Sequence, residues 1–302
     1  MSSGADSLKS ILFALGANLL IALAKTGGAD FTGSSSMLAE AIHSYADCTN
    51  QALLIWGLRE GRRQPSADHP LGHGKAIYFW SFIVALMLFS MGGLFSIYEG
   101  IHKLQARAPI EKAWIAIAIL VFGIAAESVS LWGCLREVNK ERGQQALWRW
   151  FRSSRQSELL VVFAEDVAAL GGLTLALAFI GLALFTGNPA WDAAGSIGIG
   201  VLLVVVAVLV GVEVKALLIG QSVEQRVLAQ MREHLVSQQE VEVVYNLLTQ
   251  QMGQGVMVAV KAKMRPAASA GALIEAINRV ERSFRAAFPQ VQWLFFEPDV
   301  AD

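Results

Sequence analysis

The chain has 302 residues, a formal net charge of −1, 54% hydrophobic residues and only 16% charged residues. The apolar fraction is high and the charged fraction low for a soluble globular domain. No basic run of the nucleic-acid-binding type is present in the sequence. The two cysteines, Cys48 and Cys134, both lie in apolar segments and cannot build a disulfide framework. The composition therefore indicates a membrane protein with no nucleic-acid partner.

The apolar residues gather in six blocks, each long enough to cross about 30 Å of hydrocarbon as a helix. The rest of the chain, its C-terminal part, has mixed polarity and contains no such block. We therefore expect a domain of six transmembrane helices over residues 1–220 and a small separate domain over residues 221–302. The six blocks lie near residues 8–28, 37–58, 77–101, 113–135, 158–185 and 193–219.

The C-terminal part shows a clear local pattern. Residues 256–264 alternate in polarity as a half-buried strand does, and residues 273–288 repeat apolar side chains at helical spacing. The pattern predicts a two-layer α+β domain in the order helix, strand, strand, helix, strand. The remaining elements are expected at residues 223–238 (helix), 241–248 (strand) and 291–296 (strand), with a turn at 253–255.

Lysine and arginine are concentrated in the segments after the second and fourth blocks. The other connections carry fewer of them: Lys25, Lys103, Arg107 and Lys112. Because cytoplasmic loops are enriched in these residues, both termini and the small domain are expected in the cytoplasm. The short loops favour a bacterial inner membrane. The enriched segments contain Arg59, Arg62, Arg63 and Lys75, and then Arg136, Lys140, Arg142, Arg149, Arg152 and Arg155.

The main candidate site begins with His43 and Asp47, four residues apart in the second apolar block. This spacing places both side chains on one helix face, and ionisable groups at membrane depth are costly and usually functional. An imidazole beside a carboxylate suits a divalent transition metal; a buried His–Asp hydrogen bond between helices is the alternative. A metal needs further ligands, and the adjacent acids Glu165 and Asp166 in the fifth block are the candidates. Glu40, near a helix end, is expected to be hydrated or paired.

Other polar residues are weaker candidates. Asn50 follows Asp47 by three residues, so it either lends an oxygen to the site or hydrogen-bonds between helices. Glu127, deep in the fourth block, is a candidate proton relay or a partner for a neighbouring helix. The loop residues Asp68, His69 and His73 bind metal only if other ligands converge on them, and a solvated loop is the alternative.

The whole pattern resembles the cation diffusion facilitator family, over nearly the full chain. Members of that family are homodimers in lipid bilayers that export zinc or related divalent cations in exchange for protons, so the resemblance implies an alternating-access transporter, not an enzyme. Metal is then the transported substrate and no cofactor is implied. The resemblance also implies that the small domain is ferredoxin-like. It rests on residues 33–40, His43-Ser-Tyr-Ala-Asp47-Cys-Thr-Asn50, His69-Pro-Leu-Gly-His73-Gly-Lys75, Asp192 and the C-terminal pattern.

The resemblance assigns the central metal site to His43, Asp47 and Asp166. The family pattern on the fifth helix is His-x-x-x-Asp, but the first position here is Val162, and Glu165 adjoins Asp166 instead. This Glu-Asp pair is similar to a divergent branch that includes mitochondrial zinc transporters. A site of one nitrogen and up to three carboxylates is harder than a two-histidine site, so manganese, iron, cobalt and cadmium stay open beside zinc.

Two further interpretations are open. The missing histidine at Val162 allows a non-transporting metal sensor or scaffold that kept the fold without a complete site. An intramembrane metallohydrolase is disfavoured because the sequence contains no His-Glu-x-x-His. In the C-terminal domain, the positions matching extra zinc ligands of the family hold Tyr245, Lys261, Glu297 and Asp299, so a two-zinc site there is not expected.

Overall fold

A computed structural model describes residues 3–106 and 113–301. Arg107 and Lys112, which entered the charge argument, lie outside the described residues. The chain divides into two compact units, the first comprising residues 1–57, 80–147 and 158–214, and the second residues 58–79, 148–157 and 215–302. The second unit thus joins two short inter-helix segments to the C-terminal domain. The boundary expected at residue 220 stays a prediction.

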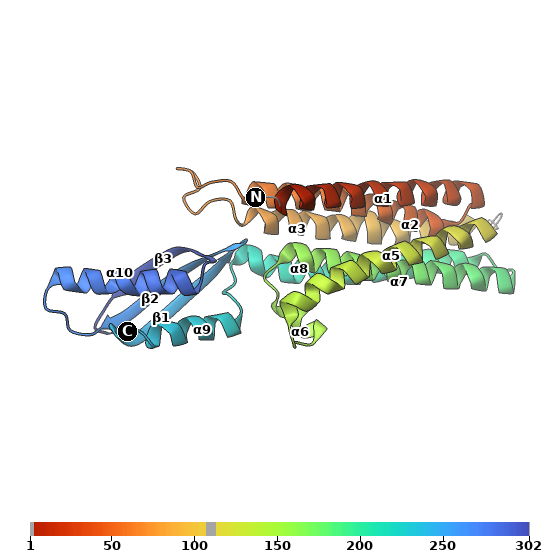
Figure 1. The fold of residues 1–302 in the computed structure, drawn as a ribbon. Helices are drawn as coiled ribbons and strands as arrows, with labels where there is room; N and C mark the ends of the chain where they lie inside the picture. Colours follow the sequence, from red (N-terminus) through yellow and green to blue (C-terminus); the bar gives the residue numbers. More distant parts are fainter. Residues whose placement is uncertain (1–2, 107–112, 302) are drawn as a thin grey trace. The chain divides into compact units, whose positions relative to one another are not determined.

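Long helices make up the first unit (Figure 1). Within the described residues, four segments are long and apolar enough to cross a membrane: Ala76–Gln105, Ala113–Arg142, Ser157–Thr186 and Ala190–Ile219. The first two helices, of 30 and 27 residues, are not among these four segments, so their assignment as spans stays a prediction. The helices are α1 (Ser3–Thr32), α2 (Ser35–Gly61), α3 (Ala76–Met87), η1 (Leu88–Leu94), α4 (Phe95–Ala106), α5 (Ala113–Arg142), α7 (Ser157–Thr186) and α8 (Ala190–Ile219).

The connection between α1 and α2 is a single tight turn. Gly33 adopts φ 64°, a left-handed conformation that glycine takes without steric cost, and its N–H closes on the Ala29 carbonyl at 2.8 Å. The Ser34 hydroxyl then accepts the Met37 N–H in the first turn of α2 and donates to Asp192 of α8 at 2.9 Å. The loop therefore fixes α2 against the start of α8.

The third long segment is not a uniform helix, because η1 between α3 and α4 is a π-helix that the sequence analysis did not predict. Its glycines allow a close approach to α8. A Cβ on Gly93 would lie 2.6 Å from Val204 Cγ2, and one on Gly200 would lie 2.6 Å from the Gly93 carbonyl oxygen. Both distances are too short for a real contact, so the small residues permit this packing.

Apolar side chains fill the centre of the first unit and also cover its outside. The interior cluster takes residues from six helical segments: Ala29, Met37, Leu88, Ala116, Leu120, Ala168, Leu173, Ala176, Ile180, Ile199, Leu203 and Ala207. Outward-facing residues such as Leu20, Phe122 and Phe185 are 69%, 62% and 90% exposed. Helices that are apolar on all faces suit a lipid environment.

The C-terminal domain is a three-stranded sheet with two helices. Strand β1 (Val241–Met252) pairs with β2 (Gly255–Met264) as an antiparallel hairpin, and β2 pairs in parallel with β3 (Val291–Pro298). Helix α9 (Gln225–Val236) precedes the sheet and α10 (Ala270–Ala287) connects β2 to β3 (Figure 1). The predicted order of elements is confirmed, although β1 extends further than expected, to Met252.

Alternation along β2 creates the core of this domain. Val256, Val258, Val260 and Ala262 are buried together with Met231 and Leu235 of α9 and Val280 and Phe284 of α10. Both helices therefore cover one face of the sheet, which gives the two layers expected from the sequence. Ser269 caps α10 by accepting the Ala272 N–H at 3.1 Å, the usual role of a serine at this position.

Hydrogen bonds join the two inter-helix segments of the second unit to the C-terminal domain. The Tyr78 hydroxyl accepts the Gly253 N–H at 3.0 Å, and Arg155 Nε donates to the Ser222 carbonyl at 2.8 Å. A short helix, α6 (Leu147–Ser153), lies in the second of these segments. It was not predicted, because seven residues are too few to establish a helical period.

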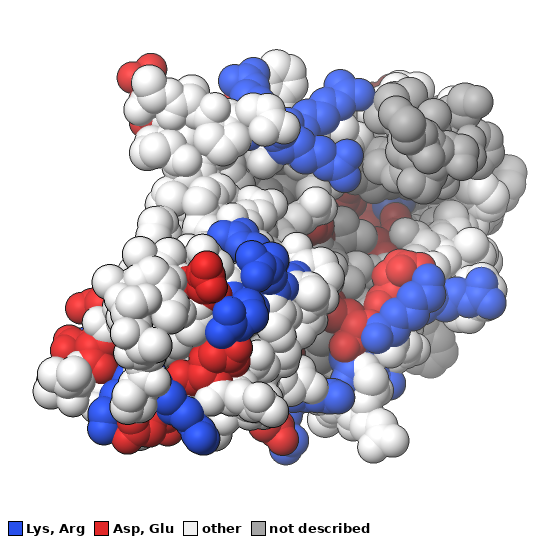
Figure 2. Space-filling model, turned by 60° about the vertical axis from the view of Figure 1, so that its left-hand side comes forward, with Lys and Arg blue, Asp and Glu red and all other residues white. Residues whose placement is uncertain are grey.

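Charges of both signs alternate over the C-terminal domain. Ion pairs among its described residues include Lys261–Asp299 at 3.1 Å, Lys263–Glu242 at 2.7 Å and Arg279–Glu240 at 2.9 Å. Figure 2 shows acidic and basic side chains next to one another on the face it presents. These ion pairs are partly exposed, so each contributes little to stability by itself.

Candidate metal site

The α2 pair of the site is formed as the spacing predicts. His43 and Asp47 face the same side of the helix, with Nε2 and Oδ2 3.6 Å apart. This distance is too long for a hydrogen bond, and the fully buried imidazole has no hydrogen-bond partner at either nitrogen. A Cβ on Gly92 of the π-helix would lie 3.9 Å from His43 Nδ1, so the imidazole faces η1. Such π-helical turns are frequent at functional sites.

The two acids of α7 face different neighbours. Glu165 Oε1 accepts a hydrogen bond from Asn50 Nδ2 of α2 at 2.5 Å. Asp166 Oδ1 accepts one from the Ser130 hydroxyl of α5 at 3.2 Å. Both carboxylates are buried, with 6% and 9% of each residue exposed. Asn50 therefore makes a helix–helix hydrogen bond, and Glu165 is the α7 acid that is linked directly to α2.

Several buried polar atoms near this pair lack a hydrogen-bond partner. Buried polar groups are nearly always satisfied, and leaving one unpaired costs about 1–3 kcal/mol. Most of the atoms concerned are oxygens or imidazole nitrogens with lone pairs, the atom types that ligate divalent cations. They are Glu40 Oε1, His43 Nδ1 and Nε2, Asp47 Oδ1, Asn50 Oδ1, Gln51 Oε1 and Asp166 Oδ2. This part of the interior is thus rich in unsatisfied acceptor atoms.

The side chains do not form a ready metal cage. Among the residues that the structure describes, no three His, Cys, Asp or Glu side chains lie close enough together to hold a metal ion. Ligation by both α2 and α7 therefore requires side-chain rotation or a small relative movement of the helices. Glu127, half-buried on α5, is within electrostatic range of Asp47, Glu165 and Asp166. The assignment of His43, Asp47, Glu165 and Asp166 as ligands stays a prediction.

The loop candidates lie in the second unit. The rings of His69 and His73 are 4.3 Å apart between centroids, and Asp68 is exposed. Ser66 and His69 exchange two backbone hydrogen bonds, at 3.1 and 3.2 Å, which closes a tight turn at the start of the motif. Between the two imidazoles, the Gly72 N–H donates to the His69 carbonyl at 2.9 Å, which closes a second turn. The role of the two histidines in metal binding stays a prediction.

One charged residue in the interior of the first unit was misjudged from the sequence. Lys25 was counted as a charge at the far end of the first helix, but it is fully buried. That expectation was wrong because α1 continues to Thr32, about two turns beyond Lys25. Lys25 Nζ lies 3.3 Å from Glu40 Oε2 and donates to the Ser44 hydroxyl at 2.8 Å. Glu40 is therefore paired rather than hydrated.

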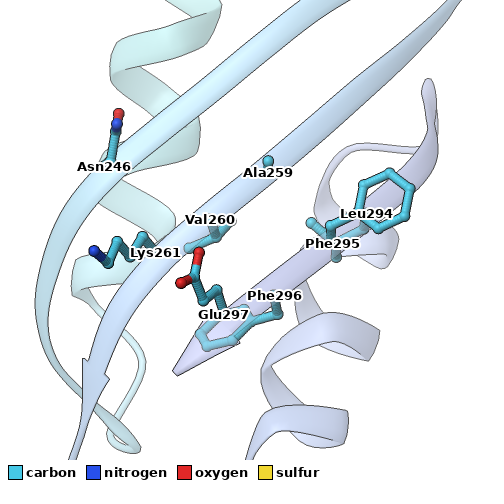
Figure 3. Close-up of a pocket in the computed structure, with 8 residues that line it drawn as sticks. All are labelled: Asn246, Ala259, Val260, Lys261, Leu294, Phe295, Phe296 and Glu297. Atoms are coloured by element: carbon cyan, nitrogen blue, oxygen red, sulfur yellow. The ribbon is translucent and has the colours of Figure 1, made fainter. Parts of the chain in front are cut away.

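A surface cavity of about 410 Å³ lies on the C-terminal domain (Figure 3). Its lining comes from all three strands: Asn246, Ala259, Val260, Lys261, Leu294, Phe295, Phe296 and Glu297. The positions that match extra metal ligands of the resembled family have other contacts here. Lys261 pairs with Asp299, and its hydrogen bond holds the pKa of that carboxyl below its usual value. The Tyr245 hydroxyl donates to the Val300 carbonyl at 2.8 Å.

Comparison with known proteins gives consistent results. The family model described as the cation efflux transmembrane domain matches residues 11–219. The protein named proton-coupled zinc antiporter SLC30A9, mitochondrial, is 36% identical over 226 residues in Xenopus laevis, covering 74% of this chain and 40% of the relative. The human protein of that name is 32% identical over 228 residues, with the same coverage of 74% and 40%.

A plant relative covers more of the chain. Metal tolerance protein C4 from Arabidopsis thaliana is 31% identical over 255 residues, which is 82% of this chain and 55% of the relative. The chain thus spans about half the length, or less, of these curated relatives.

Proposed function

The chain belongs to the cation efflux family, whose members are transporters rather than enzymes, and on that premise we propose that it exchanges a divalent metal cation for protons across a membrane. The observation that carries the proposal is that His43 and Asp47 of α2 and Asp166 of α7 carry buried oxygen and imidazole atoms without hydrogen-bond partners. Zinc is the first candidate, since relatives 32–36% identical are named proton-coupled zinc antiporters. Manganese, iron, cobalt and cadmium remain candidates because the proposed ligands are mostly carboxylates.

We propose that His43 and Asp47 of α2 receive the ion first, with Asp166 and Glu165 of α7 completing the site. The Asn50 amide donates to Glu165 Oε1 and so holds this carboxylate in place. A carboxylate has two oxygens with two lone pairs each, so Glu165 can ligate with this hydrogen bond intact. Ligands must lose protons to bind a metal, so metal and protons compete for the same atoms.

Alternating access follows from a relative movement of the helices that carry the ligands. The close contact between the third long segment and α8, at Gly93 and Gly200, favours movement of these segments as one body. Helices α2 and α7 then shift against that body to expose the ion on the other side. The proposed direction is export from the compartment of the C-terminal domain. The short loops favour a bacterial inner membrane, whereas the names of the vertebrate relatives include the word mitochondrial.

We also propose that the protein is a homodimer through the C-terminal sheet. The face of the sheet opposite the helices carries an apolar row in register across all three strands, Leu248–Ala259–Phe295. Leu248 and Phe295 are 60% and 56% exposed. A row of this kind, beside the cavity of Figure 3, suits the same row of a second copy.

Metal uptake into proteoliposomes tests the function. Zinc, manganese, iron, cobalt and cadmium are offered under an imposed pH gradient to the wild type, to Asp47→Asn and to the matched control Asp30→Asn, whose carboxylate is exposed on α1. We expect gradient-driven flux in the wild type and the control, and none in Asp47→Asn. No flux of any ion through folded wild-type protein contradicts the proposal. Metal binding without flux instead supports a sensor or scaffold, the reading that Val162 allows.

A further inference from the structure

The feature behind this inference is the buried ion pair of Lys25 and Glu40, next to the candidate metal site in sequence and in space. Lys25 and Glu40 are both fully buried. Lysine at membrane depth is rare and usually faces an acidic partner or a functional site. Two contacts of Lys25 join α1 to α2, from Nζ to Glu40 Oε2 at 3.3 Å and from Nζ to the Ser44 hydroxyl at 2.8 Å. Beside them, the Thr26 and Tyr45 hydroxyls lie 3.3 Å apart.

Two other helices leave room for this pair. A Cβ on Gly123 of α5 would lie 3.5 Å from Lys25 Cε, and a Cβ on Gly172 of α7 would collide with Glu40 Oε1. The ammonium and the carboxylate are therefore enclosed by α1, α2, α5 and α7. Glu40 Oε1 has no hydrogen-bond partner, so the second carboxylate oxygen is turned away from Lys25 and into the interior.

The pair flanks the proposed ligands on α2. Glu40 lies three residues before His43, which is one helix turn, and Ser44 directly follows His43. The Lys25 charge is within electrostatic range of His43, Asp47 and Glu127. A fixed positive charge thus stands beside a group of acidic and imidazole side chains that we assign to a divalent cation.

We propose that Lys25 is a tethered counter-cation that weakens metal binding at the α2–α7 site enough to permit release. The inference rests on the proposed function. A site with up to three carboxylates attracts a divalent ion strongly in a medium of low dielectric constant. The ammonium of Lys25 opposes that attraction, while Glu40 keeps the ammonium from being a lone buried charge. Lys25 is therefore a positioning and affinity-setting residue and is not itself a ligand.

The sign of the change in metal affinity distinguishes this role of Lys25 from a purely structural one. Removing one member of a buried ion pair destabilises a protein whichever member is removed, whereas removing both is often tolerated. Metal affinity behaves differently if the charges act on the ion. Lys25→Met removes a positive charge and tightens binding, and Glu40→Gln removes a negative charge and weakens it. The double variant has the same net charge as the wild type, so its metal affinity is expected to be close to the wild-type value.

The experiment is a double-mutant cycle on the full-length protein in detergent, with zinc as the titrant at one fixed pH. We expect zinc affinity to rise about tenfold or more in Lys25→Met and to fall about tenfold or more in Glu40→Gln, as a unit charge near a divalent ion dictates. Saturated zinc flux in proteoliposomes is expected to fall in Lys25→Met, since release slows. Lys25→Arg keeps the charge and is expected to bind zinc within about threefold of the wild type.

The matched control is the exposed ion pair Lys140–Glu137 on α5, whose atoms are 2.5 Å apart. Lys140→Met and Glu137→Gln make the same charge changes and are expected to leave zinc affinity unchanged. If Lys25→Met does not fold, the comparison of Glu40→Gln with the double variant measures the same loss of the lysine charge. If the wild type binds zinc and the zinc affinity of both single variants is weaker or unchanged, this inference alone is overturned. If the wild type neither binds nor transports any tested metal, both the proposed function and this inference are overturned.

Discussion

The contact between α8 and the third long segment gives the most quantitative prediction, through Gly200→Ala. The new methyl carbon would lie 2.6 Å from the Gly93 carbonyl oxygen, 2.6 Å from Ile97 Cγ1 and 2.8 Å from the Ile97 nitrogen. Ordinary carbon contacts are about 3.5–4.0 Å. Two of the three obstacles are backbone atoms, so no side-chain rotation can relieve the clash and the helices must separate by roughly 1 Å.

Overpacking of this kind costs about 1–3 kcal/mol. For a unit of this size, each kcal/mol lowers the melting temperature by roughly 2–4 °C, so a decrease of roughly 2–12 °C is expected. If α8 and the third segment move as one body, the separation also slows transport without removing any ligand. Flux per folded protein is then expected to fall as well.

The assay is thermal unfolding in detergent, combined with zinc flux in proteoliposomes. The matched control is Gly181→Ala in α7, where an added Cβ meets no atom within 4 Å. Alanine has the higher helix propensity, so this control is expected to be neutral or slightly stabilising. Equal melting temperatures for Gly200→Ala and Gly181→Ala would refute the claim that these glycines set the helix packing.

Two further predictions concern the second unit. Tyr78→Phe leaves the Gly253 N–H without its acceptor, so we expect a loss of about 1 kcal/mol and faster hydrogen–deuterium exchange at the hairpin turn; unchanged exchange would count against a stabilising contact. The hydrogen bond from Arg279 holds the pKa of Glu240 below its usual value. A depressed carboxyl pKa stabilises the folded state above the unfolded pKa of about 4.3, and this is lost as the pH falls through the folded value. The stability difference between wild type and Glu240→Gln should therefore shrink on acidification below about pH 5, and a constant difference would show the pair to be inert.

Contacts within one element were predictable from the sequence. The spacing of His43 and Asp47 placed both on one face of α2, and the alternation in β2 identified the strand that forms the core of the C-terminal domain. These predictions needed only the helical and strand periods. The π-helix η1 and the short α6 were not predicted, because neither has a period of its own that is long enough to recognise.

Contacts between helices could not be read from the sequence. Lys25 meets Glu40 and Ser44 only because the turn at Gly33 folds α1 back along α2, and Asn50 meets Glu165 across 115 positions of the chain. The polar residues of the candidate site also make α2 harder to recognise as a membrane span. The polar residues Glu40, His43, Asp47 and Asn50 dilute the apolar character of α2, which is why α2 does not meet the hydropathy criterion for a membrane span.

Anomalous X-ray scattering from crystals grown with zinc would locate the bound ion and so test the proposed metal site. We expect one ion between α2 and α7, within about 2.0–2.2 Å of a His43 nitrogen and of Asp47 and Asp166 oxygens. Zinc found only at Asp68, His69 and His73 or elsewhere outside the helices, with none beside His43, would contradict it.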